Sequence, residues 1–115
     1  MERIQNIADV QRVFDSFAGP DVYVHLETTN GAYAAHRNEQ TMTVGAFIRN
    51  ARISFERGTL AGKGPYRAGL KMEHGWVYAE GLTHWLLNEK GQLLLSGHDD
   101  QGRLAVALQL SRTPF

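Results

Sequence analysis

The pattern of apolar positions divides the chain into a short helical part and a long β part. Apolar side chains recur at helical spacing near the N-terminus: Ile4, Ile7, Ala8, Val10, Val13, Phe14 and Phe17. Asn6 or Asp9 can cap the start, and Gly19-Pro20 ends the pattern, because glycine adopts the left-handed conformation at helix ends and proline cannot continue a helix. The pattern predicts one amphipathic helix over residues 4–18, packed on a face or an open end of a sheet.

From residue 22 onward, apolar and polar residues alternate in short runs that are typical of half-buried strands. Turn signals separate these runs, among them residues 89–91 and 99–102. Since strands joined by short turns usually pair with their sequence neighbours, we predict an antiparallel meander of seven to eight strands over residues 22–111. This mainly β fold would be a barrel or a barrel-like sandwich, and we expect residues 1–115 to form a single domain.

The first hairpin is predicted over residues 22–37, because Asn30-Gly31 separates two alternating runs and is a strong hairpin signal. A two-residue turn at this position would set His25 opposite His36. Glu27 lies on the same face as His25, since side chains two residues apart on a strand point the same way. The hairpin therefore gathers two imidazoles and a carboxylate on one face of the sheet.

The cluster of His25, Glu27 and His36 has two interpretations. Facing positions on one sheet face hold Cβ atoms about 4.5–5.5 Å apart, which is close enough for three ligands to bind a divalent metal and leave one position open. The alternative is a hydrogen-bonded polar face in which Glu27 pairs with Arg37 or Arg49. A His-x-Glu spacing on a strand lacks the specificity of His-Glu-x-x-His on a helix, so the pattern favours the polar face.

A second hairpin follows, and the sequence leaves its register open. A three-residue loop would pair Met72 with Trp76 and turn Glu80 toward the apolar face of the strand pair. A two-residue turn would pair Met72 with Val77 and turn Glu80 to the other face, beside Lys71. The register decides whether the carboxylate of Glu80 points toward the core or toward solvent.

Polar and aromatic residues gather in and just after this hairpin. They form the candidate ligand-binding set: Tyr66, Arg67, Trp76, Tyr78, Glu80 and His84. Aromatic walls with one acid and one base suit a small polar ligand. The alternative is a single ion pair between glutamate and arginine that only fixes the strand register.

Composition narrows the classes of function. The 12 basic and 12 acidic residues give a net charge of zero, which argues against a nucleic-acid partner. No cysteine is present, so disulfides, thiolate metal sites and thiol nucleophiles are excluded. The N-terminus lacks the apolar stretch of a secretory signal, and no apolar run is long enough to span a membrane. We therefore expect a cytoplasmic protein with no membrane partner.

Several stretches between residues 22 and 111 resemble, in order, the YojF family of small bacterial proteins: VYVHLETTNGAYAAH, VGAFIRNA, GKGPYRAGLK, GWVYAEGLTH, SGH and LAVALQLS. The resemblance implies a domain of unknown function found mainly in Firmicutes. It also implies a gene neighbourhood that often includes a bacillithiol-type deacetylase, and hence a thiol-metabolism deacetylase as a partner. The family supplies no established catalytic residues that could be carried over to this chain.

Two functions follow from these observations. The first is a non-catalytic accessory module that binds a small ligand or a protein, and the absence of a thiol, a catalytic triad and a phosphate loop favours it. The second is a small metal-assisted or acid–base enzyme that uses His25, Glu27 and His36; a divalent metal is the one cofactor that the sequence suggests. Adjacent leucines at 86–87 and 93–95 leave apolar side chains on both strand faces, which predicts a homodimer. The alternative is that the N-terminal helix covers the second apolar face.

Overall fold

The computed structural model describes residues 1–29 and 44–115, which contain one helix and nine strands. The helix is α1 (Ile7–Phe17). The strands are β1 (Glu2–Arg3), β2 (Val22–Thr29), β3 (Gly45–Ile53), β4 (Arg57–Ala61), β5 (Tyr66–Lys71), β6 (Trp76–Leu82), β7 (His84–Leu87), β8 (Leu93–His98) and β9 (Leu104–Ser111). Within these residues no helix is both long and apolar enough to cross a membrane.

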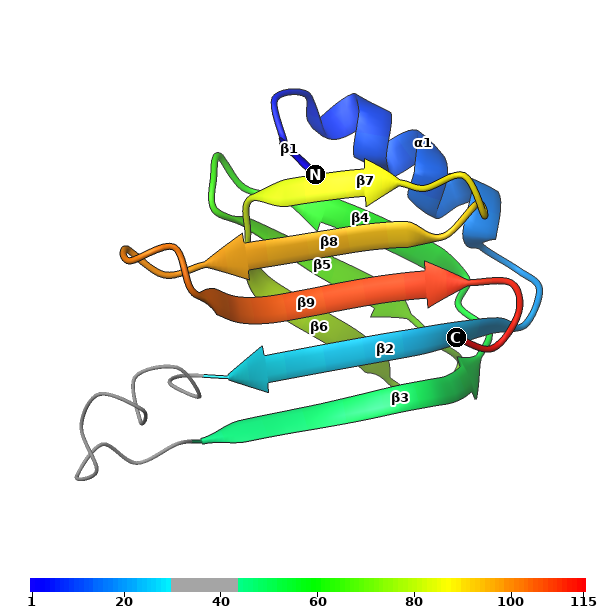
Figure 1. Cartoon of the computed structure of the whole chain (residues 1–115). Coiled ribbons are helices and arrows are strands. Elements are labelled where there is room, and N and C mark those ends of the chain that lie inside the picture. The colour runs from blue at the N-terminus through cyan, green and yellow to red at the C-terminus, as the bar shows by residue number, and fades with distance from the viewer. Residues whose placement is uncertain (30–43) are drawn as a thin grey trace.

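The strands form two antiparallel sheets. The larger has the order β1-β7-β8-β9-β2-β3 and the smaller the order β4-β5-β6. Figure 1 shows the smaller sheet behind the larger one, with α1 lying along the side where β4 and β7 are found. The mainly β fold with one N-terminal helix is confirmed, and its form is a barrel-like sandwich; the described strands do not close into a barrel.

The strands do not form one continuous meander. The connections from β3 to β4 and from β6 to β7 each pass from one sheet to the other, and β9 pairs with β2. The prediction of a single meander was therefore wrong at these connections. The described strands between residues 22 and 111 number eight, as predicted, and β1 adds a short strand before the helix. Sequence neighbours pair in space only where both belong to the same sheet, and the choice of sheet depends on packing.

The helix agrees closely with its prediction. Asn6 caps it, since its side chain accepts a hydrogen bond of 3.0 Å from the backbone N–H of Ala8. Val10, Phe14 and Phe17 form the buried stripe that packs on the sheets. The helix begins at residue 7 rather than residue 4, because the Ile4 N–H donates to the Thr83 carbonyl (2.8 Å) and extends the pairing of β1 with β7.

The predicted pairing of residues 22–37 was wrong. β2 has β3 on one side and β9 on the other, so both of its hydrogen-bonding edges are occupied along most of its length. Thr29 lies opposite Gly45, and His25 lies opposite Arg49 on β3 and Gln109 on β9. The predicted turn and His36 lie outside the described residues. The local turn signal could not reveal that β3, which begins at Gly45, and β9, near the C-terminus, would be the partners of β2.

Candidate functional site

The hairpin of β5 and β6 has a register that neither sequence alternative gave. Lys71 lies opposite Trp76, so Met72 pairs with neither Trp76 nor Val77. The Met72 N–H instead donates to the Gly75 carbonyl at 2.8 Å, which tightens the turn. Because side chains alternate along a strand, this register fixes which residues point away from the core.

Arg67 and Glu80 lie directly opposite each other on the outer face of the smaller sheet. Their side chains form an ion pair of 2.5 Å between Arg67 Nη2 and Glu80 Oε1, and both remain largely exposed. Glu80 thus shares its face with Lys71, as the two-residue alternative predicted. The placement of Glu80 on the apolar face was wrong, because that face carries the buried Leu70 and Ala79.

Trp76 and Tyr78 form an exposed aromatic pair on the same outer face. Their ring centroids are 5.3 Å apart with an interplanar angle of 9°, and 44% of Trp76 and 52% of Tyr78 are exposed. Gly69 lies opposite Tyr78, and a Cβ there would be 3.0 Å from Tyr78 Cε1, so glycine allows the ring to lie against β5. Arg67 Cζ is 6.0 Å from the Tyr78 centroid. Trp76, Tyr78, Arg67 and Glu80 therefore form a continuous set, here called the outer row.

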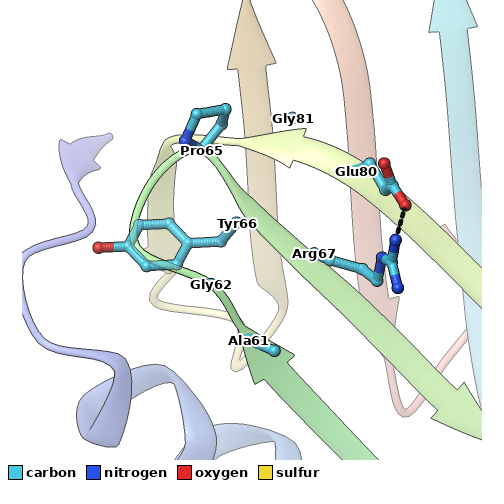
Figure 2. A pocket seen from close by; sticks show the side chains of 7 residues that line it. All are labelled: Ala61, Gly62, Pro65, Tyr66, Arg67, Glu80 and Gly81. Carbon is cyan, nitrogen blue, oxygen red and sulfur yellow. Dashed lines mark ion pairs between the residues drawn. The ribbon is translucent and has the colours of Figure 1, made fainter.

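A cavity of about 360 Å³ adjoins the outer row at the end of the hairpin. Seven residues line this first cavity: Ala61, Gly62, Pro65, Tyr66, Arg67, Glu80 and Gly81. Figure 2 shows the Arg67–Glu80 ion pair on one side of it and the Tyr66 ring pointing to the other side. Gly62 (φ +110°) and Gly81 (φ +87°) supply the backbone bends that open it. Its volume lies within the range of small-molecule sites.

The structure brings five of the six candidate ligand-binding residues onto this hairpin. Tyr66, Arg67 and Glu80 line the first cavity, and Trp76 and Tyr78 continue along the outer row. His84 lies apart from them on β7 of the larger sheet. Its Nδ1 is 2.7 Å from Thr83 Oγ1, and its ring meets that of His98 edge-on at 5.4 Å.

The environment of His84 is electropositive. Burial lowers its pKa below the ordinary value of 6.5, and the positive charges of Arg3, His98 and the N-terminal amine lower it further. Arg3 lies directly opposite His84 in the pairing of β1 with β7. The site around His84 therefore differs in charge from the outer row, where Arg67 and Glu80 balance each other.

His25 and Glu27 form a dyad on the outer face of the larger sheet. His25 Nε2 is 3.0 Å from Glu27 Oε1, whereas the buried Nδ1 has no hydrogen-bond partner among residues 1–29 and 44–115. Only 7% of His25 is exposed, and the rings of Phe47 and Phe115 lie 6.4 and 6.5 Å from it. Glu27 thus pairs with His25. The polar-face alternative predicted an arginine partner: Arg49 forms no ion pair with Glu27, and Arg37 lies outside the described residues.

Two members of the predicted metal cluster lie together, and the third, His36, falls outside the described residues. Among residues 1–29 and 44–115, no group of three histidine, aspartate or glutamate side chains could hold a metal ion. Because Glu27 holds Nε2, the ring nitrogen of His25 left for a ligand is Nδ1, which has no partner among the described residues.

Sequence reasoning missed a second cavity on the other side of Pro65 and Tyr66. Its charged residues are Arg3 and Lys63, which lie 60 positions apart in the sequence. No sequence pattern links them, although the glycines that flank Lys63 mark a bend. Only the packing of β1 beside the β4–β5 turn brings the two together.

A family model, a sequence relative and a solved structure each match most of this chain. The family model described as "Protein of unknown function (DUF1806)" matches residues 4–115. The uncharacterized protein YojF of Bacillus subtilis (strain 168) is 51% identical over 107 residues, which cover 93% of this chain and 92% of that protein. The crystal structure of the Bacillus subtilis YojF protein matches with a TM-score of 0.84 and 43% identity, covering 99% of this chain and 95% of that chain.

The resemblance predicted from the sequence stretches is thereby confirmed. The relative carries no described activity in its name, and the family description assigns none. The chain belongs to the DUF1806 family of proteins of unknown function.

Proposed function

We propose that this protein is a non-catalytic module of the cytoplasm that binds a small polar ligand containing a ring. The observation that carries the proposal is the position of the outer row beside the first cavity. One short hairpin thus offers apolar ring faces, a guanidinium and a carboxylate within one continuous surface.

The exposed aromatic pair supports binding because it has no role in the core. Large aromatic side chains usually bury most of their surface, so exposed aromatic surface often marks a contact site. Trp76 and Tyr78 instead stack on each other at the surface. A sugar or other ring placed against them would cover apolar surface at little conformational cost, since aromatic side chains have few rotatable bonds.

The Arg67–Glu80 ion pair supports recognition of a polar ligand. An exposed ion pair contributes at most about 1 kcal/mol to stability, so a ligand can replace part of it at low cost. Arginine offers only donors and ionised glutamate only acceptors, so together they can bind hydroxyl and amide groups in a fixed orientation.

The resemblance to the YojF family indicates the first ligand to test. Its implied gene neighbourhood leads us to propose bacillithiol or a related thiol conjugate as the ligand. A thiol-metabolism deacetylase is the corresponding protein partner, to which the module would present the bound conjugate.

Isothermal titration calorimetry with bacillithiol tests the proposal. Trp76→Ala and Tyr78→Ala should each weaken binding at least about tenfold, because buried aromatic side chains dominate many binding sites. Phe47→Ala is the matched control, since it removes an exposed aromatic ring from the other sheet. Binding that is absent, or that is unchanged in both hairpin variants, would contradict the proposed site.

Acid–base or metal chemistry at the His25–Glu27 dyad is the second candidate function. The buried Nδ1 of His25, which lacks a hydrogen-bond partner within the described part of the chain, supports it. A carboxylate that holds Nε2 orients the ring and leaves Nδ1 to accept a proton or bind a metal. Zinc or manganese should then raise the Tm of the wild type and not that of His25→Gln. Purified protein without stoichiometric metal and without such a shift would rule out the metal form.

A further inference from the structure

The second cavity has a volume of about 330 Å³ and lies between the two sheets at one end of the sandwich. Its lining combines β1 with the β4–β5 turn and the β6–β7 connection: Arg3, Ile4, Lys63, Gly64, Pro65, Tyr66 and Thr83. The Ile4 N–H donates to the Thr83 carbonyl at 2.8 Å and fixes Arg3 at this edge. Gly62 (φ +110°) and Gly64 (φ +101°) hold Lys63 at the turn.

The charges of this cavity are all positive. Arg3 and Lys63 are exposed, and neither forms an ion pair with any residue of the described ranges. No aspartate or glutamate is among the lining residues. In a protein whose total charge is zero, two cations at one cavity without a carboxylate are a local excess that favours an anion.

Polar side chains beside the two cations complete the lining. The Thr83 hydroxyl is held within the protein, 2.7 Å from His84 Nδ1 and 3.5 Å from the Ser96 carbonyl oxygen. Tyr66 also lines the cavity. Arginine can bind an oxyanion with two parallel hydrogen bonds, and lysine adds a compact positive charge.

A separate observation agrees with the positive potential. The pKa of His84 is lowered first by burial and then by the charge of Arg3, with no carboxylate among the groups that act on it. This shift follows from the pairing of β1 with β7, which sets Arg3 directly opposite His84.

We infer that the second cavity binds the oxyanion group of a small molecule, a phosphate or a carboxylate, between Arg3 and Lys63. The cavity adjoins the first one at Pro65 and Tyr66, but the inference does not depend on the ligand proposed for the outer row. The second cavity would thus be a separate binding site, which requires a negatively charged group on its ligand.

Titration with inorganic phosphate and with malonate at fixed ionic strength tests the inference and separates the two sources of the oxyanion. Calorimetry should show saturable binding of at least one of them to the wild type. Arg3→Gln and Lys63→Gln should each weaken it at least about tenfold, because hydrogen bonds to charged groups are the stronger class. Lys90→Gln removes the same charge from the exposed β7–β8 turn and should leave the affinity unchanged.

Three outcomes would overturn the inference: no binding of either anion at millimolar concentration, equal binding in the wild type and both cavity variants, or an equal loss in Lys90→Gln. Circular dichroism and thermal melting establish that each variant is folded. If Arg3→Gln disturbs the pairing of β1, Lys63→Gln still decides the result, because Lys63 lies in an exposed turn.

Discussion

Gly97 on β8 lies against the backbone of Gly81, at the point where the chain leaves the smaller sheet for the larger one. A Cβ added to Gly97 would lie 1.8 Å from the Gly81 carbonyl oxygen and 2.9 Å from Val106 Cγ1. Gly81 itself has φ +87°. The connection from β6 to β7 can therefore cross over β8 only because position 97 has no side chain.

Gly97→Ala is expected to destabilise the protein by about 3 kcal/mol or more, because the methyl group would collide with backbone atoms that cannot move independently. Urea unfolding measures the change. Gly75→Ala is the control, since its nearest side-chain neighbour would be the Met72 Cε at 3.8 Å, an ordinary contact. Equal stability of Gly97→Ala and the wild type would contradict the close approach.

Asp99 is expected to contribute to the acid sensitivity of the protein. Its pKa lies below 3.8, chiefly because its carboxylate accepts a hydrogen bond from the Arg103 backbone N–H, with further hydrogen bonds from the Arg103 side chain and the Gln101 N–H. A lowered native pKa stabilises the fold above the unfolded value of 3.8, and this stabilisation is lost as pH falls below that value toward the native pKa.

Asp99→Asn should therefore flatten the decrease in Tm below about pH 4, relative to the wild type. Thermal melting at a series of pH values measures the slope. Asp100→Asn is the control, because Asp100 is the exposed neighbour in the same turn and forms no ion pair with the described residues. A slope that changes equally in both variants would refute the assignment to Asp99.

His84 is expected to titrate below 6.5, since burial and the charges of Arg3 and His98 disfavour its protonated form. A histidine with a lowered native pKa binds its proton more readily in the unfolded chain. Stability should therefore decline as pH falls below 6.5, until the native group is also protonated. Two-dimensional NMR of the imidazole signals measures the native pKa directly.

Arg3→Gln should raise the pKa of His84, because Arg3 is the charge that lowers this pKa most. Lys90→Gln changes the net charge equally and should have little effect. An unchanged His84 titration in Arg3→Gln would show that Arg3 does not contribute to the field at this position.

The homodimer expected from the sequence stays a prediction, and β3 is the surface to examine. Among the strands that the structure describes, β3 forms one edge of the larger sheet, and 71% of Phe47 and 54% of Ile48 are exposed there. An edge strand can pair with the same strand of a second copy, which would satisfy the open hydrogen-bonding groups of both. We therefore expect antiparallel pairing of β3 with its counterpart.

Multi-angle light scattering should give a dimer for the wild type and a monomer for Ile48→Lys, because a charge on an edge strand opposes pairing. Leu87→Lys is the comparison variant, since Leu87 is an exposed leucine on β7 at the other end of the larger sheet. Dissociation by Leu87→Lys alone would show that the interface lies on β7 and not on β3. A wild-type monomer at micromolar concentration would contradict the predicted dimer.

Interactions between residues close in sequence were sufficient to predict some parts of this structure. The apolar stripe of α1, the cap at Asn6 and the Gly19-Pro20 ending involve neighbours within a few residues, so the sequence alone predicted the helix. The turn at residues 99–102 is likewise local, because the Asp99 carboxylate binds backbone N–H groups of the same turn. The alternation along β6 also predicted that Trp76, Tyr78 and Glu80 share a face.

Tertiary packing decided the remainder. The face of β6 that points outward depended on the register with β5, where Lys71 meets Trp76, and a shift by one residue would have reversed it. The partners of β2 are β3, which begins at Gly45, and β9, near the C-terminus, so the turn signal near residue 30 gave the wrong neighbour for His25. Arg3 and Lys63 meet at one cavity because β1 pairs with β7 beside the β4–β5 turn. The sequence determined the elements whose contacts are local, whereas the sites depended on long-range pairing that no single stretch encodes.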